Sequence, residues 1–201
     1  MSNETQVLRC LQEDGYGLTE KGKAQAKEVA GVLRDSKPAV IFCSPLTRTR
    51  ETAEYVAKET GASIVEDDLL IEIQVPEMHG RPYHELRDLV MDAGAFRDMR
   101  KKIGSGESYL DVYLRLLRFL EKVDREYEGA HIIVVTHKVV VGGVHMVESI
   151  SVSKYAHLRY LWMPGMGNAD TLTLAYKHLP DIPSHQTHPT CLLYTSPSPR
   201  D

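Results

Sequence analysis

The stretch AVIFCSPLTRTRETAEYV, residues 39–56, reads as a short buried strand followed by the start of a helix. The apolar run 39–43 is rich in β-branched and aromatic residues, and the Ser-Pro pair after it supplies a turn. Arg48 and Arg50 fall in the first turns of the helix that is predicted over 46–60. Because free backbone N–H groups and the helix dipole favour an anion there, the stretch predicts an anion site at the carboxyl end of a strand.

Strands and helices alternate along the rest of the chain, an order typical of an α/β protein. We predict a three-layer α/β/α sandwich with a mainly parallel central sheet and a small helical insertion. The insertion is the polar stretch 92–105, which follows a loop and a helix within 67–90. The other helices are predicted over residues 18–38, 46–60, 106–129 and 137–150, and the strands over 39–43, 62–66, 131–136, 158–163 and 171–176.

The longest amphipathic pattern covers residues 106–129, and Gly129 marks its end. Apolar residues recur along it at helical spacing, so one face of this helix is expected to pack on the sheet. The residues predicted for that face are Leu110, Tyr113, Leu114, Leu117 and Leu120.

The two ends of the chain are its least regular parts. The first strand should precede Leu18, but TQVLRCL is a poor strand sequence, so we predict a single domain over 1–177 whose first strand is poorly formed or missing. A tail follows over 178–190. The last eleven residues, CLLYTSPSPRD (191–201), resemble the translation of a sequencing-library adapter. We interpret them as a non-native segment and expect the fold to lie outside them.

The composition is that of an ordinary soluble globular protein, with 42% hydrophobic and 26% charged residues. A formal net charge of −4 gives no general attraction to nucleic acid or to an anionic membrane, and no apolar run approaches the roughly 18 residues of a membrane span. Cys10, Cys43 and Cys191 are too scattered for a disulfide framework or a zinc site. The N-terminus lacks the pattern of a signal peptide. We therefore expect a cytoplasmic protein without a bound metal.

Three residue types suited to phosphate chemistry follow predicted strands. Phosphoryl transfer needs positive groups around the phosphate oxygens, a nucleophile, and an acid for the leaving oxygen. Arg48 and His137 lie at strand–helix junctions that should meet at the carboxyl edge of a parallel sheet. Arg48 offers forked donors, and Glu72, on a loop, is suited to protonating a leaving oxygen. Each residue alone is common on surfaces or in cores, and only the combination indicates a phosphate site.

Six segments of the chain, from residue 17 to residue 176, resemble motifs of the histidine phosphatases, the phosphoglycerate-mutase-like superfamily. Each motif is weak alone, but all six occur in the family's order, which makes the match specific. The segments are GLTEKGKAQAKEVAGVL, FCSPLTRTRETAEYV, LLIEIQVPEMHGRPYHEL, GESYLDVYLRLLRFL, IIVVTHKVVV and MGNADTLTLAY.

This resemblance implies phosphoryl transfer through a phosphohistidine, without a metal or nucleotide cofactor. It implies that Arg48 binds the phosphate, that His137 is the second pocket histidine and that Glu72 donates the proton, with Glu77 as the second choice of donor. The implied partner is a phosphorylated small molecule or a phosphoprotein, and neither nucleic acid nor a membrane is expected as a partner. The resemblance leaves the substrate and the oligomeric state open.

The family's nucleophile, the histidine of an R-H-G motif, has no match in this chain. Arg9 matches the motif's arginine, a second phosphate-binding group, but Cys10 stands at the nucleophile position and Leu11 at the glycine. The C-x5-R loop of cysteine phosphatases is not formed either, because the sixth residue after Cys43 is Thr49. Loss of a covalent nucleophile costs on the order of a millionfold in turnover, or roughly 8 kcal/mol.

Four interpretations remain open from the sequence. In the first, the parent protein is a phosphatase and this chain is impaired by the loss of its first strand. In the second, the chain is a pseudo-phosphatase that binds a phosphorylated ligand without turnover. Phosphoglycerate-mutase-type transfer is the third, although the insertion over 92–105 is short for a dedicated mutase. In the fourth, the chain is a chimera damaged at both ends, which predicts poor solubility.

Overall fold

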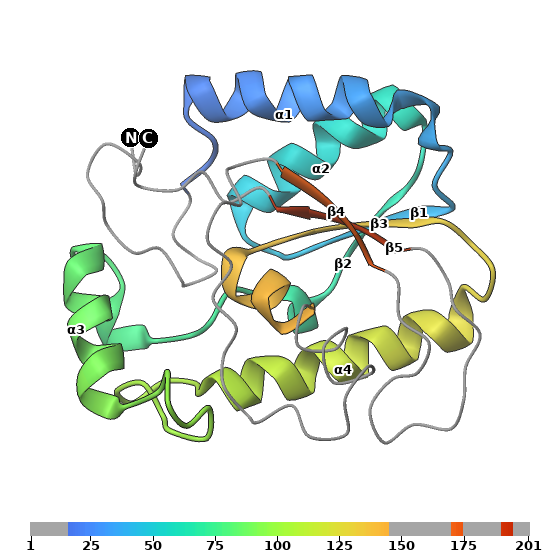
Figure 1. The fold of residues 1–201 in the computed structure, drawn as a ribbon. Helices are drawn as coiled ribbons and strands as arrows, with labels where there is room; N and C mark the ends of the chain where they lie inside the picture. Colours follow the sequence, from blue (N-terminus) through green and yellow to red (C-terminus); the bar gives the residue numbers. More distant parts are fainter. Residues whose placement is uncertain (1–15, 145–169, 175–189, 195–201) are drawn as a thin grey trace.

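The computed structural model of the chain describes residues 16–144, 170–174 and 190–194, and these form a five-stranded sheet with helices on both faces (Figure 1). The strand order is β2-β1-β3-β5-β4. Adjacent strands are parallel except for β4 and β5, which are antiparallel. The strands are β1 (Val40–Cys43), β2 (Ile64–Glu66), β3 (Ile132–Thr136), β4 (Asp170–Leu174) and β5 (Thr190–Tyr194).

The side chains of β1 and β3 alternate between the two faces of the sheet, so the core has two layers. Side chains of successive strand residues point to opposite faces of a sheet. One face packs against α1 (Glu20–Leu33) and α2 (Thr47–Thr60), and the other lies over α4 (Tyr109–Glu126) (Figure 1). The α1/α2 side receives Ile41, Cys43, Ile133 and Val135, and the α4 side receives Val40, Phe42, Ile132 and Val134. The predicted three-layer α/β/α sandwich is confirmed.

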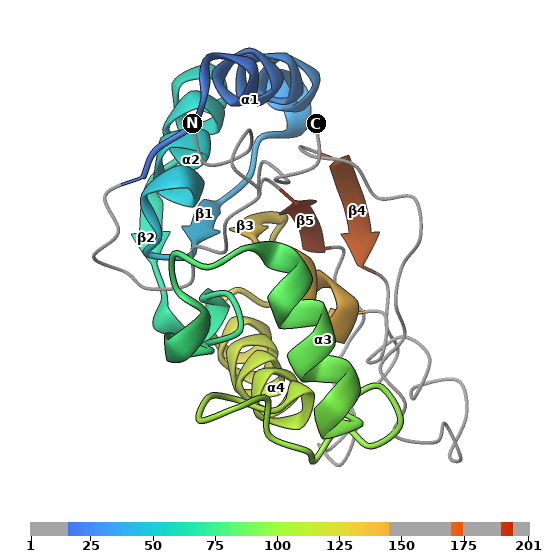
Figure 2. The same ribbon diagram turned by 90° about the vertical axis from the view of Figure 1, so that its left-hand side faces the viewer.

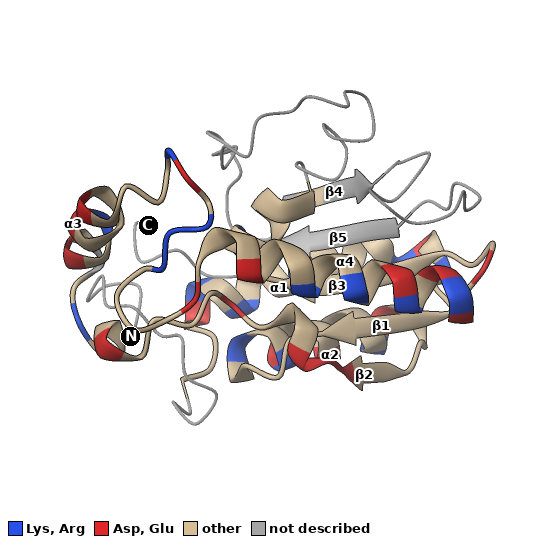
Figure 3. Cartoon of the chain, turned by 90° about the horizontal axis from the view of Figure 1, so that it is seen from below, with Lys and Arg blue, Asp and Glu red and all other residues tan. Residues whose placement is uncertain are grey.

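Local sequence signals explain where the helices begin and end. Thr19 caps α1 by accepting a hydrogen bond from the backbone N–H of Gly22 at 3.0 Å. The C-cap of α2 is Gly61, whose φ of 76° is strained for any residue with a Cβ atom. The short 3-10 turn η2 (Arg34–Ser36) follows α1. Acidic and basic residues are interspersed along α1 and α2 (Figure 3).

The buried face of α4 differs from the prediction. Leu114 is 44% exposed, and Leu110 and Leu117 are only half-buried. The helix is apolar around a wide arc, and packing selects the part of the arc whose Phe119 ring meets the Phe42 ring edge-on, at a centroid distance of 5.3 Å. The apolar residues that are buried are Tyr109, Val112, Tyr113, Leu116, Phe119, Leu120 and Val123.

The segment between β2 and α4 lies beyond the carboxyl ends of the parallel strands. It contains two 3-10 turns, η3 (Asp68–Leu70) and η4 (Pro76–Met78), and then α3 (Tyr83–Ala93), which stands apart from α1, α2 and α4 in Figure 1 and in front of the sheet in Figure 2. Turns follow α3, and buried Ala95, Met99 and Ile103 anchor them. The predicted polar insertion over 92–105 is therefore a turn segment with an apolar side.

One strand comes from a segment that was expected to lie outside the fold. β5 pairs in parallel with β3 from Ile132↔Thr190 to Thr136↔Tyr194, and it includes residues 191–194 of the adapter-like segment. Pairing satisfies backbone N–H and C=O groups along the second edge of β3, which would otherwise be an open edge. The predicted strand over 158–163 and the predicted first strand before Leu18 lie outside the described residues.

Candidate active site

Two parallel neighbouring strands, β1 and β3, end side by side and bring two polar residues together. Cys43 pairs with Val135, so Ser44 and His137 follow the strands at the same edge of the sheet. The backbone N–H of Ser44 extends the pairing by donating to the carbonyl of Val135 at 3.0 Å. A helix begins shortly after each of these two residues: α2 begins at Thr47, after Ser44, and a second helix begins at residue 138, directly after His137. Both helix N-termini therefore face the same place, which is favourable for an anion.

His137 lies fully buried between Arg48 and Ser44. Its Nδ1 atom is 3.2 Å from Nη2 of Arg48, and its Nε2 atom is 2.8 Å from Oγ of Ser44. A guanidinium group has donors only, so Nδ1 must accept in this contact. We therefore assign the proton to Nε2, which donates to the Ser44 hydroxyl.

The surroundings of His137 favour its neutral form. Burial is the largest cause that lowers its pKa well below the usual value, and the positive charges of Arg48 and Arg115 lower it further. A neutral ring is the form that the Arg48 contact requires, so the electrostatics and the hydrogen bonding agree.

Glu72 is 8% exposed and lies on the loop between η3 and η4. Burial is the largest influence on its carboxyl and raises the pKa above the ordinary value. The backbone N–H of Ile73, which donates at 2.9 Å, opposes this rise, as do Arg48, Arg115 and the backbone N–H of Val139. Because Arg48 acts on both groups, Glu72 and His137 share one electrostatic environment, in which Glu72 tends to keep its proton.

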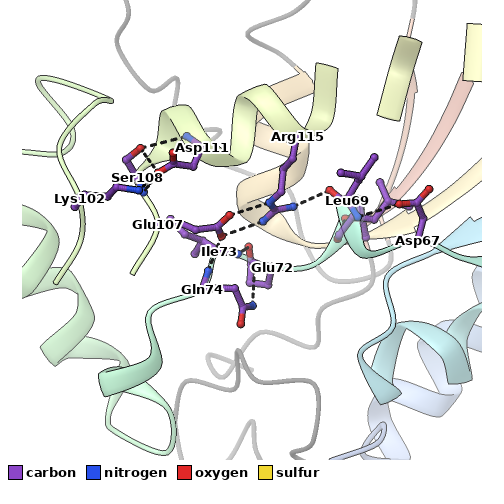
Figure 4. A network of polar contacts seen from close by, with 12 residues as sticks. Asp67, Leu69, Glu72, Ile73, Gln74, Lys102, Glu107, Ser108, Asp111 and Arg115 are labelled. Atoms are coloured by element: carbon purple, nitrogen blue, oxygen red, sulfur yellow. Dashed lines mark hydrogen bonds and ion pairs between the residues drawn. The ribbon is translucent and has the colours of Figure 1, made fainter. Parts of the chain in front are cut away.

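A polar network holds the loop that carries Glu72 (Figure 4). Arg115 of α4 donates from Nη1 to the carbonyl of Leu69 at 2.8 Å, and from Nε to Oε1 of Glu107 at 3.1 Å. Glu107 accepts from the backbone N–H of Gln74 at 2.8 Å. No role is predicted from the sequence for Glu107 or Arg115, although both lie in the segment GESYLDVYLRLLRFL, because nothing in their spacing shows that they reach the Glu72 loop.

Two other candidate residues, Arg50 and Glu77, are exposed, whereas Arg48, Glu72 and His137 are buried. Arg50, two residues after Arg48, has a side chain that is 46% exposed and lies 3.7 Å from Glu66. Glu77, the second choice of proton donor, is exposed and accepts hydrogen bonds from Ser105. Arg9 and Cys10 lie outside the described residues. Ser44 was not predicted as a contact of His137, although its place after a buried strand is a usable signal.

Within residues 16–144, 170–174 and 190–194, no group of three or more His, Cys, Asp or Glu side chains is arranged to hold a metal ion. No helix among these residues is both long and apolar enough to cross a bilayer.

Known proteins resemble both the sequence and the fold. Phosphoserine phosphatase 1 of Hydrogenobacter thermophilus is 34% identical over 130 residues, which are 61% of this chain and 59% of that protein. Phosphoglycerate mutase-like protein 4 of Arabidopsis thaliana is 32% identical over 133 residues, 63% of this chain and 56% of that protein. The chain thus aligns with less than two thirds of the length of these relatives.

Solved structures extend the likeness to almost the whole chain. YhfR of Bacillus stearothermophilus matches with a TM-score of 0.72 and 25% identity over 94% of this chain and 89% of that one. A mycobacterial glucosyl-3-phosphoglycerate phosphatase, 22% identical, shares the fold with a TM-score of 0.72 over 96% of this chain and 95% of that one. The model of the histidine phosphatase superfamily (branch 1) matches residues 3–162. The chain therefore belongs to the histidine phosphatase superfamily.

Proposed function

We propose that the parent protein is a phosphomonoesterase that acts through a phosphohistidine, and that this chain is impaired in turnover. The observation that carries the proposal is the contact of Arg48 with His137 at the carboxyl ends of β1 and β3, beside two helix N-termini, with the buried Glu72 carboxyl near enough to feel the Arg48 charge. These groups supply a cation, a ring donor and a proton in one place, as phosphoryl transfer requires.

Each side chain has a proposed task that follows from its chemistry. Arg48 binds the phosphate oxygens, because its forked donors match them and it stays charged at all working pH values. His137 turns its Nε2–H, which donates to Ser44 in the structure, to the phosphate or stabilises the transferred group. Glu72 gives its proton to the leaving oxygen, a task that a raised pKa favours near neutral pH.

The nucleophile is the weak point of this chain. Cys10 stands at the position of the family's histidine, with Arg9 before it as a second phosphate-binding group. Restoring the motif with Cys10→His and Leu11→Gly should therefore raise hydrolysis well above the level of the unaltered chain. The names of the relatives suggest small phosphorylated metabolites, such as phosphoserine and phosphoglycerate derivatives, as first substrates to assay.

The test compares steady-state hydrolysis of p-nitrophenyl phosphate, phosphoserine and 3-phosphoglycerate by the unaltered chain and the restored variant. We expect hydrolysis by the restored variant, its loss in Arg48→Ala, His137→Ala and Glu72→Gln backgrounds, and little change with Arg50→Ala. Trapping of an acid-labile, base-stable phosphoenzyme would support the phosphohistidine. Phosphate release that is the same with and without Arg48 would contradict the proposal.

Cys10 itself favours a second candidate, a pseudo-phosphatase that holds a phosphorylated small molecule or phosphoprotein without turnover. Binding of inorganic phosphate with no hydrolysis in either protein would support it. Interconversion of 2- and 3-phosphoglycerate without net phosphate release would instead indicate mutase-type transfer, the activity in the name of the Arabidopsis relative.

A further inference from the structure

The segment that carries Glu72 is fastened at both ends. At its start, the carbonyl of Leu69 accepts a hydrogen bond from Nη1 of Arg115 at 2.8 Å. At its end, Gln74 is bound twice by Glu107: its backbone N–H donates to Oε2 at 2.8 Å, and its carbonyl accepts from the Glu107 backbone N–H at 2.7 Å. Glu72 lies between these two attachments (Figure 4).

Glu107 and Arg115 join the two attachments into one unit. Nε and Nη2 of Arg115 reach the two carboxylate oxygens of Glu107 at 3.1 and 3.3 Å, a forked pairing. Both side chains are mostly buried, 11% exposed for Arg115 and 22% for Glu107. An ion pair in such surroundings is screened less than a surface pair, so its geometry is well held.

Two further features hold the Glu72 segment close to its neighbours, one at Gly106 and one at Thr136. A Cβ atom on Gly106 would lie 2.1 Å from the carbonyl oxygen of Gln74, so only glycine allows the Glu107 backbone to bind there. The hydroxyl of Thr136, the last residue of β3, donates to the carbonyl of Leu70 at 2.7 Å. The Glu72 segment is thereby tied to the strand that ends directly before His137.

We propose that the Glu107–Arg115 pair is a positioning device that keeps the Glu72 carboxyl buried and within reach of the Arg48 charge. Glu107 and Arg115 are positioning residues and not catalytic residues, because their contacts are to the backbone of the Glu72 segment. This inference rests on the proposed role of Glu72 as the proton donor, but the position of its carboxyl can be measured without any turnover.

The pKa of the Glu72 carboxyl depends on how deeply the group is buried, so it can be used to detect a change in the position of the carboxyl. Burial is what raises its pKa, while the charged and polar groups around it all act in the opposite direction. These opposing groups are Arg48 of α2, Arg115 of α4, and the backbone N–H groups of Ile73 and Val139. If the segment loosened, water would reach the carboxyl and its pKa would fall toward the ordinary value of 4.5.

The experiment is a titration of Glu72 by carbon-13 NMR of side-chain carboxyls in the full chain, with the signal assigned by its loss in Glu72→Gln. Two variants weaken the device without changing net charge. Arg115→Lys removes the forked geometry, and Gly106→Ala pushes the Glu107 backbone away from Gln74. Glu77→Gln is the control, because it alters an exposed carboxylate of the neighbouring turn that contacts Ser105.

We expect the pKa of Glu72 to fall toward its ordinary value in Arg115→Lys and Gly106→Ala, and to stay unchanged in Glu77→Gln. An unchanged pKa in both folded variants would overturn the proposal, as would a rise. Should one variant fail to fold, the other still tests the proposal.

In the Cys10→His, Leu11→Gly protein, the same variants should lower kcat at least about tenfold with little change in KM. An absence of hydrolysis there would count against the proposed function and leave the NMR result valid.

Discussion

Arg48 and His137 are hydrogen-bonded across the two strand–helix junctions of the site, with 3.2 Å between Nη2 and Nδ1. A permanently charged donor on Nδ1 holds the ring in the neutral form, and the Ser44 hydroxyl accepts a hydrogen bond from the Nε2–H of the ring at 2.8 Å. The two residues are 89 positions apart in the chain, so only the fold brings them into contact. The contact links the cation of one junction to the ring of the other and leads to the first two predictions.

Replacing Arg48 should weaken phosphate binding strongly. Arg48→Ala removes charge-assisted hydrogen bonds worth about 1.5–3 kcal/mol, so the Kd for inorganic phosphate should rise roughly 10- to 100-fold, as measured by isothermal titration calorimetry. Arg50→Ala is the matched control, because Arg50 lies on the same helix but is exposed beside Glu66. An equal loss in both variants would show that general charge, and not this site, attracts the anion.

Removing the Ser44 hydroxyl should destabilise the protein more than an ordinary serine substitution does. Ser44→Ala leaves the buried Nε2–H of His137 without its acceptor, at a cost of about 1–3 kcal/mol in the free energy of unfolding. Ser36→Ala removes a half-buried hydroxyl that donates to the carbonyl of Leu33, and should cost no more than about 1 kcal/mol. Urea unfolding of both variants checks this, and equal costs would argue against the assigned tautomer.

The stability of the Glu72→Gln variant relative to the wild type should increase as the pH rises. The pKa of Glu72 is raised on folding, so the folded state holds the proton more tightly and the wild type loses stability as the pH rises above the unfolded value of 4.5. The loss is complete above the folded pKa and amounts to about 1.4 kcal/mol for each unit of the rise. A neutral glutamine avoids it, so the difference in unfolding free energy should move in favour of Glu72→Gln between pH 4.5 and 8.

Glu77→Gln provides a control of opposite sign for this experiment. Hydrogen bonds from Ser105 lower the pKa of Glu77, so its stabilising contribution is present above pH 4.5 and is lost as the pH falls through the folded pKa. The two stability differences should therefore depend on pH in opposite ways. A Glu72→Gln difference that does not vary with pH would contradict the raised pKa.

Cys43 should not react in the folded protein. It is fully buried at the end of β1, and burial, with the negative charge of Glu66, raises its pKa to about 12. The thiolate is the reactive form, so thiol reagents should modify Cys43 only after unfolding. Iodoacetamide labelling with mass spectrometry of the peptide, with and without urea, tests this. Rapid labelling of Cys43 under native conditions would reopen the question of a cysteine nucleophile.

Much of the fold follows from local sequence patterns. β1, α2 and β3 lie where the sequence predicts them, because a short apolar run and a glycine at a helix end act through neighbouring residues. The parallel order of the strands then places Arg48 and His137 at one edge, so this part of the site was also predictable. Helical periodicity was less informative for α4, where Leu114 belongs to an apolar arc but lies exposed.

The sequence alone determined the α/β class, the order of elements and the residue types that phosphate chemistry needs, since these depend on short patterns. Only the tertiary structure decided which arc of α4 is buried, that β5 pairs with β3, and that Glu107 and Arg115 hold the Glu72 segment. The physical reason is that these choices depend on packing and hydrogen bonds between residues distant in the chain. Leu69 and Arg115 are 46 positions apart, and no local pattern specifies their contact.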